Sequence, residues 1–352
     1  MIDCAFFIHT PAQAHLWAQV MKKLIARGIS AVAIIRGGYD ISHLLEAYKL
    51  PSVTYGISAK TSHLKIIQLP GHFFTACSLL KAYEPSMVIG TGPVEATAAA
   101  ILRKTCVIFE DSEPTPGLER SLWKRFSGAI ITPSCFSLDL GNKHIRIPSY
   151  KELSYLHPNH FIPDPSVLRE LGVNPGEKYA ILRFNAFDAV HDIGRKGFSL
   201  NDKYKLVKTL EPFTRIFISS EDPLPEDLDK YRLAVAVHRI HHVLNYAHLL
   251  VADTGTMATE AAVLGVPSVM CLSNYHEFGN FRELESDYGL MFCFNSSASA
   301  IEKAVELIQQ PNLKQDWSKK KEKLLLHKID LAGFIAGLII KWPESFYELK
   351  AD

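Results

Sequence analysis

Residues 249–269, LLVADTGTMATEAAVLGVPSV, form the segment that most limits how this chain can fold. The apolar run Leu249–Ala252 leads into a polar turn at 253–256 and then into a helical pattern that stops at Gly265. Pro267 precedes a second apolar run. Glycine just after a helix and proline beyond it are common stop signals. The segment therefore predicts a strand, a tight turn, a helix and a second strand, which is the building unit of a parallel α/β sheet.

The helix of this segment begins at a place suited to binding a phosphate group. A helix N-terminus presents unpaired N–H groups and the positive end of the helix dipole. Thr254 and Thr256 add hydroxyl groups, and Gly255 lets the backbone approach a ligand closely. Glu260 lies four residues beyond Thr256 on the same helix face, where a carboxylate can accept hydrogen bonds from ribose hydroxyls. The alternative interpretation is an ordinary α/β turn with a capped helix.

The same segment resembles the nucleotide-binding segment of GT-B glycosyltransferases and of the non-hydrolysing UDP-N-acetylglucosamine 2-epimerases. The epimerase pattern is Asp-Ser-Gly-Gly, two variable residues, Glu-Glu, and later Leu-Gly-x-Pro. The positions in register are Asp253, Thr254, Gly255, Thr256, Thr259, Glu260, Leu264, Gly265 and Pro267. Thr256 replaces the second glycine and Thr259 the first glutamate. From about residue 5 to residue 310 the chain also resembles an uncharacterised prokaryotic family, domain of unknown function 354, which is predicted to share this fold.

The composition is that of a globular protein long enough for two domains. The chain has 352 residues, of which 47% are hydrophobic and 21% are charged. A formal net charge of +1 offers no electrostatic argument for nucleic-acid binding, so we expect no nucleic-acid partner. The cysteines are scattered without a Cys-x-x-Cys pair, which indicates reduced cysteines rather than a disulfide framework or a zinc site.

The sequence predicts neither a signal peptide nor a membrane span. Asp3 precedes the first apolar run and Lys22 follows it, which is not the order of a signal peptide. The longest apolar tract, Leu331–Ile340, is shorter than the roughly 18 residues needed to span a bilayer and predicts a buried terminal helix. The lysines of 319–323 predict a solvated helix face, with weak association with an anionic membrane or polymer as the alternative. We expect a cytoplasmic protein.

Short apolar runs alternate with helical patterns in both halves of the chain. The predicted strands are Ala5–Ile8, Ala31–Ile35, Ser52–Tyr55, Met87–Gly90, Cys106–Phe109, Ala129–Thr132, Tyr179–Arg183, Arg215–Ile218, Leu233–Val235, Leu249–Ala252, Ser268–Cys271 and Leu290–Phe292. Helical patterns between them include Ala14–Arg27, His63–Tyr83, Glu95–Arg103 and Ala298–Gln309. This alternation predicts parallel sheets with right-handed crossovers. With the resemblance, it leads us to expect an α/β, GT-B-like fold in which two Rossmann-like parallel-sheet domains face a cleft.

The alternation breaks at a proline-rich stretch near the middle of the chain. Pro148, Pro158, Pro163 and Pro165 occur there with little periodicity, which indicates an interdomain connection. The predicted order is an N-terminal acceptor domain over 1–150, a linker over 151–176, a C-terminal nucleotide-sugar-binding domain over 177–328, and a C-terminal helix and tail over 329–352.

Polar loops follow two of the strands in the first half. The first strand is followed by His9, Gln13 and His15 instead of the Gly-x-Gly-x-x-Gly of a dinucleotide site. These three residues are candidates for acceptor contact or proton transfer, and we favour His9. Gly92 lies in a Gly-Thr-Gly turn that suits close approach to a ligand, although the glycines are equally explained by a tight turn alone.

A third loop is dense in carboxylates. Glu110, Asp111 and Glu113 follow a buried strand, where one carboxyl group can have a raised pKa and act as a general base. Capping of the next helix is the alternative role. We predict Asp111 and Glu113 as catalytic residues.

In the second half, Arg183 ends the first strand, where a guanidinium suits a pyrophosphate clamp, and the epimerase-like proteins have an arginine in this region. The loop His191–Gly197 offers further cations, and His276 lies in a loop expected to contact the sugar or base. Histidines at 238, 241, 242 and 248 have spacings that share a helix face, as in some metal sites. No recognised zinc pattern accompanies them, and we predict no metal.

Together with the resemblance, these features predict a metal-independent glycosyltransferase with a nucleotide-sugar donor, UDP-linked, an unidentified acceptor and no cofactor. Arg183 and backbone N–H groups stabilise the departing diphosphate in place of a divalent cation. Asp111 or His9 deprotonates the acceptor hydroxyl. Two alternatives remain open: an enzyme like the non-hydrolysing UDP-sugar 2-epimerases, and a non-catalytic protein that binds a nucleotide-sugar or a polymer.

Overall fold

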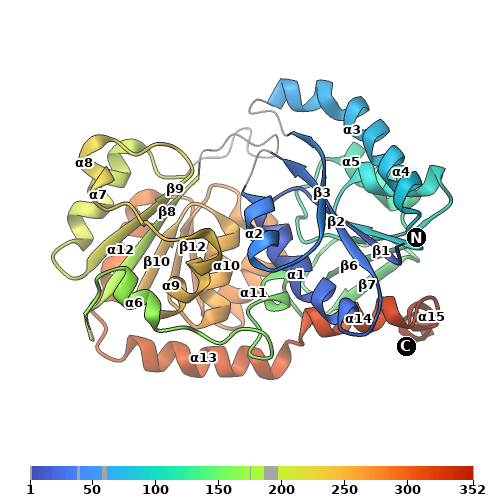
Figure 1. The fold of residues 1–352 in the computed structure, drawn as a ribbon. Coiled ribbons are helices and arrows are strands. Elements are labelled where there is room, and N and C mark those ends of the chain that lie inside the picture. Colours follow the sequence, from blue (N-terminus) through green and yellow to red (C-terminus); the bar gives the residue numbers. More distant parts are fainter. Residues whose placement is uncertain (1, 38–39, 58–61, 175, 186–196, 352) are drawn as a thin grey trace. The chain divides into compact units, whose positions relative to one another are not determined.

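The computed structural model describes residues 2–37, 40–57, 62–174, 176–185 and 197–351, and it divides into two compact α/β units (Figure 1). The first unit runs up to His160 and resumes at Ile329, and the second lies between Phe161 and Lys328. Each unit holds one parallel sheet. The prediction of two Rossmann-like parallel-sheet domains is therefore confirmed.

The first unit is built on a seven-stranded sheet in the order β3-β2-β1-β4-β5-β6-β7. All neighbouring strands in it are parallel. The strands are β1 (Cys4–Ile8), β2 (Ala31–Gly37), β3 (Ser52–Ile57), β4 (Met87–Gly90), β5 (Thr105–Phe109), β6 (Ala129–Pro133) and β7 (His144–Ile147). Every residue of β1 is buried, as expected for a strand in a parallel sheet that is covered on both faces.

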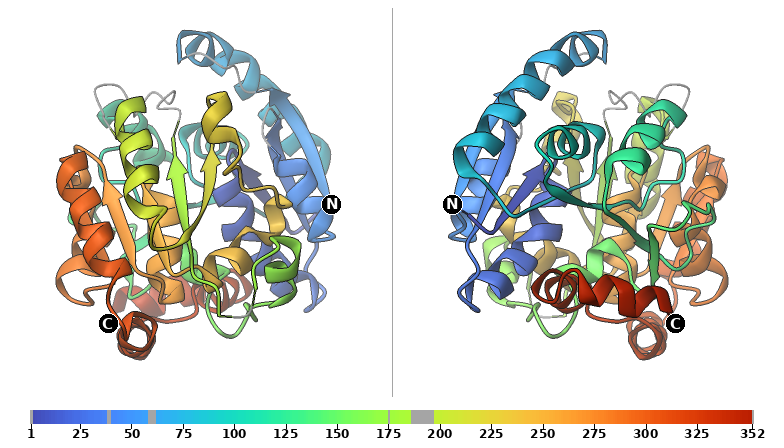
Figure 2. Two further views of the ribbon diagram at one scale, coloured as in Figure 1. Left: turned by 90° about the vertical axis from the view of Figure 1, so that its left-hand side faces the viewer. Right: turned by 90° about the vertical axis from the view of Figure 1, so that its right-hand side faces the viewer.

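Helices cover both faces of this sheet, as Figure 2 shows from two sides. The helices are α1 (Pro11–Ile25), α2 (Ile41–Ala47), α3 (Ser62–Tyr83), α4 (Pro93–Ile101), α5 (Gly117–Phe126), η1 (Lys151–Ser154), α14 (Leu331–Ile340) and α15 (Glu344–Ala351). On one face, Phe6 of β1 packs in a core with α1, α2 and α14. On the other, Phe7 packs in a core with α3, α4 and α5. Successive side chains of a strand point to opposite faces, so β1 contributes to both cores.

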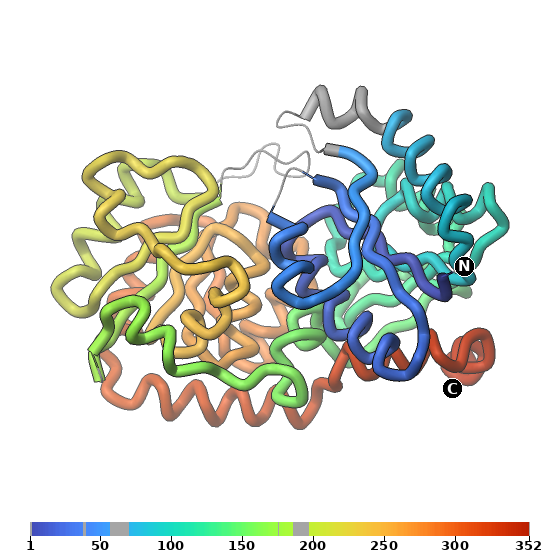
Figure 3. Tube along the Cα trace, in the orientation of Figure 1, coloured from blue at the N-terminus to red at the C-terminus, as the bar shows by residue number. Residues whose placement is uncertain are grey.

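The C-terminal segment packs in the first unit. Figure 3 shows this red segment beside the blue N-terminal elements, and α14 packs on α1. Asp330 caps α14 by accepting a hydrogen bond from the N–H of Gly333, and it lies 2.7 Å from Nε2 of His160. The buried helix predicted over Leu331–Ile340 is present with these bounds.

The second unit is built on a five-stranded parallel sheet in the order β12-β11-β10-β8-β9. The strands are β8 (Tyr179–Phe184), β9 (Arg215–Ser220), β10 (Leu249–Ala252), β11 (Ser268–Cys271) and β12 (Met291–Phe294). The helices are α6 (Ser166–Glu170), α7 (Leu200–Leu210), α8 (Glu226–Asp229), η3 (Val237–Arg239), α9 (Ile240–Tyr246), α10 (Gly255–Leu264), η4 (Tyr275–Glu277), α11 (Gly279–Ser286), α12 (Ser297–Ile308) and α13 (Leu313–His327). The strand-turn-helix-strand unit predicted from residues 249–269 is present as β10, α10 and β11.

Two strand assignments differ from the prediction. The strand predicted at Leu233–Val235 is wrong: Arg232 forms one isolated bridge with Ile218, and the residues after it are partly exposed beside the edge strand β9. Conversely, β7 was not predicted, because its sequence His-Ile-Arg-Ile is short and half polar, as suits an edge strand with an exposed Arg146.

The stretch 151–176, expected to be a linker, is divided between the two units. η1 lies in the first unit, with Leu153 completely buried, and α6 lies in the second.

Candidate functional site

The strand order of each sheet reverses direction at one place, and several of the predicted site residues lie at these two places. In the first sheet the reversal lies between β1 and β4, and in the second between β8 and β10. Ligands of open α/β sheets bind outside the carboxyl ends of the strands at such switch points. His9 and Gly92 follow β1 and β4, whereas Arg183 and Thr254 lie at the ends of β8 and β10.

His9 is held in a polar network at the end of β1. Its backbone N–H donates to Oε1 of Gln13, whose Nε2 donates to Oγ1 of Thr91 beyond β4. Its ring nitrogen Nε2 lies 2.9 Å from the hydroxyl of Tyr55 and 3.8 Å from Oε2 of Glu95. Burial lowers the pKa of His9 to about 4 although Glu95 opposes the change, so the imidazole is neutral at pH 7. A neutral imidazole can accept a proton, which a general base must do.

His15, a further candidate from the same loop, is placed differently. It is buried, and its Nδ1 lies 2.6 Å from the hydroxyl of Tyr48. Its ring also packs against Tyr155. These contacts place the side chain in the interior of the first unit, and we leave it out of the candidate site.

The turn at Gly92 is occupied by a side chain of the protein itself. Oε1 of Glu95 accepts hydrogen bonds from the N–H groups of Thr91 and Gly92, at 2.7 and 2.6 Å. A Cβ atom at Gly90 would lie 2.3 Å from the same carboxylate oxygen. The glycine at 90 is thus required by the folded-back Glu95, and the N–H of Gly92 is already bonded within the protein.

The three carboxylates beyond β5 have different surroundings. Glu110 is buried, and its burial, followed by the charge of Asp111, raises its pKa to about 8. Asp111 pairs with Nζ of Lys151 at 2.8 Å. Glu113 is buried and accepts a hydrogen bond from the N–H of Ser137. The raised pKa expected in this loop is found at Glu110, and the catalytic roles predicted for Asp111 and Glu113 stay predictions.

In the second unit, Asp253 organises the loops around the switch point. Its side chain is buried at the end of β10, and its two oxygens accept hydrogen bonds from the N–H groups of Asn185 and Phe198, at 2.7 and 3.2 Å. Burial raises the pKa of Asp253 to about 6, although the two hydrogen bonds lower it. Asp253 thus holds the chain after β8 and before α7 close to the start of α10.

Among the described residues, no side chain caps the N-terminus of α10. Thr254 occupies the cap position, but its hydroxyl bonds to no backbone N–H, and its Oγ1 is buried without a hydrogen-bond partner. Thr256 lies in the first turn and is partly exposed. A Cβ atom at Gly255 would lie 2.4 Å from Cζ of Phe281. The structure therefore gives Gly255 a packing role against α11 that the sequence did not reveal.

Arg183 lies beside this N-terminus on the neighbouring strand. Its guanidinium donates to Oγ of Ser219 at 3.1 Å and pairs with Glu221, both at the end of β9. Its side chain remains 19% exposed, enough to reach a ligand. The guanidinium has five N–H hydrogens, so donors remain for a further anion.

Glu260 lies on α10 in a buried ion-pair geometry. Its Oε1 is 3.0 Å from Nε2 of His241 on α9, and both side chains are about 6% exposed. His276 is exposed on η4, where its ring packs edge-on against Tyr275. Residues 191–196 of the predicted cationic loop lie outside the described residues.

The histidine-rich segment does not form a metal site in the part of the chain that is described. His241 pairs with Glu260, and Nδ1 of His242 accepts the N–H of Asp164. The described residues contain no group of three or more His, Cys, Asp or Glu side chains that can hold a metal ion. The described cysteines are free, with Cys77 and Cys135 less buried than the others.

The lysine run on α13 makes contacts within the protein. Nζ of Lys320 donates to the carbonyl of Gly289 at 2.7 Å and lies over the ring of Trp317, and Nζ of Lys323 donates to the carbonyl of Asp287. Among the helices of the described residues, none is long and apolar enough to cross a membrane.

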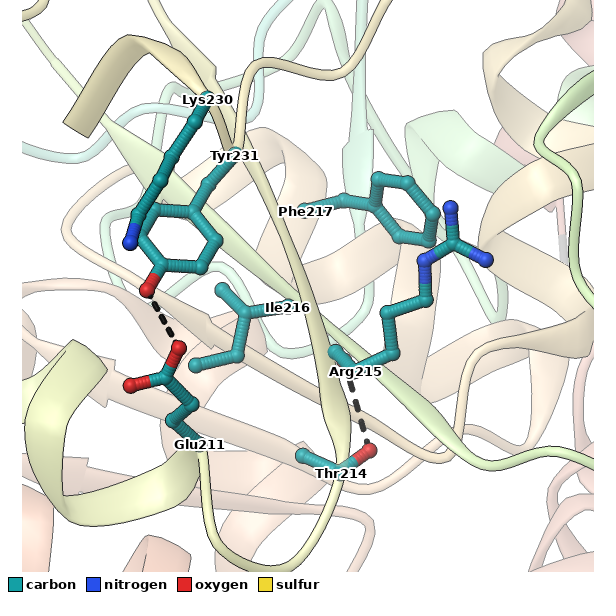
Figure 4. Close-up of a pocket in the computed structure, with 7 residues that line it drawn as sticks. All are labelled: Glu211, Thr214, Arg215, Ile216, Phe217, Lys230 and Tyr231. Atoms are coloured by element: carbon teal, nitrogen blue, oxygen red, sulfur yellow. Dashed lines mark hydrogen bonds between the residues drawn. The ribbon is translucent and has the colours of Figure 1, made fainter. Parts of the chain in front are cut away.

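A pocket of about 440 Å³ lies away from both switch points (Figure 4). It is lined by Glu211, Thr214, Arg215, Ile216, Phe217, Lys230 and Tyr231. These residues surround the amino end of β9, whereas ligands of parallel sheets bind at the carboxyl ends. The guanidinium of Arg215 is already bonded to the carbonyls of Leu171 and Gly172. We therefore do not place the site there.

Comparison with solved structures places this geometry in a known fold. No model of a protein family and no curated protein matches the sequence. A complex of S. aureus MnaA with UDP matches with a TM-score of 0.71 at 12% identity, over 100% of this chain and 98% of that one. UDP-GlcNAc 2-epimerase from Neisseria meningitidis bound to UDP-GlcNAc matches with 0.70 at 13%, over 97% and 100%. Spinosyn forosaminyltransferase SpnP matches with 0.63 at 13%, also over 97% and 100%. The chain has the GT-B-like fold. The resemblance inferred from the sequence is thereby confirmed at the level of fold.

Proposed function

We propose that the chain is a metal-independent glycosyltransferase that uses a UDP-sugar donor, with the diphosphate at the N-terminus of α10. The observation that carries this proposal is the uncapped first turn of α10 at the switch point of the second sheet, one strand away from Arg183. Uncapped N–H groups and a guanidinium are the donors that an anionic diphosphate requires. The binding of UDP and UDP-GlcNAc by two proteins of this fold supports the choice of nucleotide.

In this proposal each residue around α10 has one task. Thr254 and Thr256 donate hydroxyl hydrogen bonds to the phosphates, and Arg183 carries the positive charge that stabilises the leaving UDP. Glu260 accepts hydrogen bonds from the ribose, with His241 holding its carboxylate in place. His276 and its loop contact the sugar or base. A cationic side chain and helix N–H groups thus do the work of a divalent metal.

Proton removal from the acceptor is assigned to the first unit. His9 is the stronger candidate because its imidazole is neutral, whereas the carboxylate of Asp111 is committed to Lys151. Loss of a general base of this kind lowers turnover by about 10²- to 10⁴-fold. In the same proposal Gly92 lies beside His9, where a Cβ atom would be in ordinary van der Waals contact, 3.6 Å from Cε1 of the imidazole.

Thermal unfolding with and without nucleotide tests the binding step. UDP or a UDP-sugar should raise the melting temperature, because a ligand that binds only the folded state stabilises it by mass action. Arg183→Ala and Glu260→Gln should abolish the increase while both proteins stay folded. Glu285→Gln on α11, whose carboxylate bonds to the N–H of Cys293, is the matched control and should keep it. An undiminished increase in both site variants would place the nucleotide elsewhere.

Chelation tests the absence of a metal requirement. With the leaving group neutralised by Arg183 and helix N–H groups, activity should survive EDTA. Strict dependence on magnesium or manganese would contradict the mechanism.

A second candidate, 2-epimerisation of a UDP-sugar, is favoured by one observation. Glu110 keeps its proton near neutral pH, and epimerisation needs acid and base groups on the sugar without an acceptor. Incubation with UDP-sugars separates the candidates by their products. Free UDP with a larger glycoside supports transfer, an inverted sugar or an elimination product supports epimerisation, and neither product supports a protein that only binds.

A further inference from the structure

The first unit buries a carboxylate beside His9 that the proposed reaction has not used. Glu95 is completely buried, and one of its oxygens, Oε1, caps the turn through Thr91 and Gly92. The other oxygen, Oε2, has no hydrogen-bond partner among the described residues and lies 3.8 Å from Nε2 of His9. An unpartnered buried carboxylate oxygen is costly, so its retention next to an imidazole needs a reason.

The two nitrogens of His9 have different surroundings. Nε2 points to the interior, toward Tyr55 and Glu95. Nδ1 bonds to no described residue and is not one of the buried atoms that lack a partner, so it remains open to solvent. A carboxylate near Nε2 favours the tautomer that carries its hydrogen there, donating to the oxygen of Tyr55. That tautomer leaves the lone pair of Nδ1 facing outward.

We propose that Glu95 and Tyr55 are positioning residues that hold His9 with Nδ1 outward as the base of the reaction. This proposal rests on the glycosyl transfer proposed above. Tyr55 fixes the ring through Nε2, and Glu95 stabilises the imidazolium that forms when Nδ1 takes up a proton. Besides capping the turn, Glu95 then stabilises the positive charge that forms on His9 during turnover. This role explains why its Oε2 is buried beside the imidazole.

The proton and electron pairs balance in one displacement. The acceptor hydroxyl gives its proton to Nδ1 as its oxygen forms a bond to the anomeric carbon. The bond between that carbon and the UDP oxygen breaks, and its electron pair leaves with UDP. The imidazolium returns to the neutral form by releasing the proton to solvent after the products leave.

Other charged groups near His9 also change the pKa of its imidazole. Arg36 on β2 and His72 on α3 both lower the pKa of His9, and Glu95 on α4 raises it. Tyr55 on β3 remains protonated, because burial raises its own pKa. Glu95 is thus the one group of this set that favours the charged imidazole.

Glu95→Gln is the variant that isolates this role. The amide oxygen of glutamine can still accept the N–H groups of Thr91 and Gly92, so the turn keeps its cap. Only the second oxygen changes, to an NH₂ group that cannot stabilise an imidazolium. Asp139→Asn is the matched control, since Asp139 also lies 3.8 Å from a histidine nitrogen, in His144, but is exposed.

Two measurements on these variants test the proposal. In ¹⁵N NMR of the wild type near pH 7, His9 should carry its hydrogen on Nε2. Glu95→Gln should lose that preference, and Asp139→Asn should not change the His9 signal. In transfer assays Glu95→Gln should lower kcat at least about tenfold with the donor KM unchanged, and Tyr55→Phe should lower it less.

The outcomes are distinguishable. An unchanged His9 tautomer in Glu95→Gln overturns the positioning role whatever the reaction is. A changed tautomer with unchanged kcat overturns the role in catalysis. Absence of transfer by the wild type overturns the proposed glycosyltransferase function, and with it the catalytic role, while the tautomer measurement still decides whether Glu95 orients His9.

Discussion

Glu110 should make the protein less stable as the pH rises toward neutrality. The side chain is 7% exposed, and its pKa is raised to about 8 from an ordinary 4.5, first by burial and then by the charge of Asp111. Below about pH 4.5 the carboxyl group is protonated in both the folded and the unfolded chain. Between 4.5 and 8 the unfolded chain releases the proton while the folded chain keeps it, so the free energy of unfolding falls.

The size of this effect follows from the separation of the two pKa values. Each pH unit of difference corresponds to about 1.4 kcal/mol, so the full separation corresponds to about 5 kcal/mol. The pKa of about 8 already includes the hydrogen bonds from the N–H of Ser112 and the hydroxyl of Thr115, which favour the charged form and lower the pKa. The loss begins near pH 4.5 and is complete just above pH 8.

Glu110→Gln tests the prediction, because glutamine has nearly the same shape and no titrating proton. Urea unfolding of the wild type and the variant should be measured at intervals from pH 4.5 to 9. The variant should gain stability relative to the wild type across this range and reach a constant difference above pH 8. Glu302→Gln, at an exposed position on α12, should show a flat difference. A flat difference for Glu110→Gln would mean that Glu110 ionises normally in the folded protein.

Two further predictions concern the second unit. Gly255→Ala should destabilise the fold by about 1–3 kcal/mol, because its Cβ would lie 2.4 Å from Cζ of Phe281. Gly117→Ala, which meets no atom within 4 Å, is the control in the same chemical denaturation experiment, and equal stability of the two variants would refute the packing role. Glu221→Gln should tighten UDP binding severalfold in calorimetry, since it frees the guanidinium of Arg183 from its ion pair. Weaker binding would show that Glu221 instead orients Arg183 for the ligand.

Local patterns in the sequence predicted the strands of both sheets except the edge strand β7. Continuous apolar runs such as Leu249–Ala252 are buried on both faces of a parallel sheet, so they stand out from their polar surroundings. The edge strand β7 lacks this signal. The strand β7, with its exposed Arg146, was missed, and the apolar Leu233–Val235 was assigned wrongly beside the edge strand β9.

The side chains that pair with the site residues could not be predicted from local sequence patterns. Glu221, which pairs with Arg183, is 38 positions away in sequence, and His241 and Glu260 are 19 positions apart with β10 between them. Charge and burial at a site come from such distant contacts, so no local pattern distinguished the buried Glu110 from its neighbour Asp111. The strongest sequence signal for Glu110 was its position immediately after an apolar strand.

Glycines near a site illustrate why residue type alone does not establish a ligand contact. Gly90 ends β4 and Gly255 begins α10, and by residue type both suit close approach to a phosphate. In the fold each is required by a side chain of the protein, Glu95 for Gly90 and Phe281 for Gly255. The two turns differ in their N–H groups: Glu95 bonds to those of Thr91 and Gly92 just before α4, whereas among the described residues no side chain caps the N-terminus of α10. The uncapped first turn of α10, rather than the glycine, is therefore the feature on which the proposed diphosphate site rests.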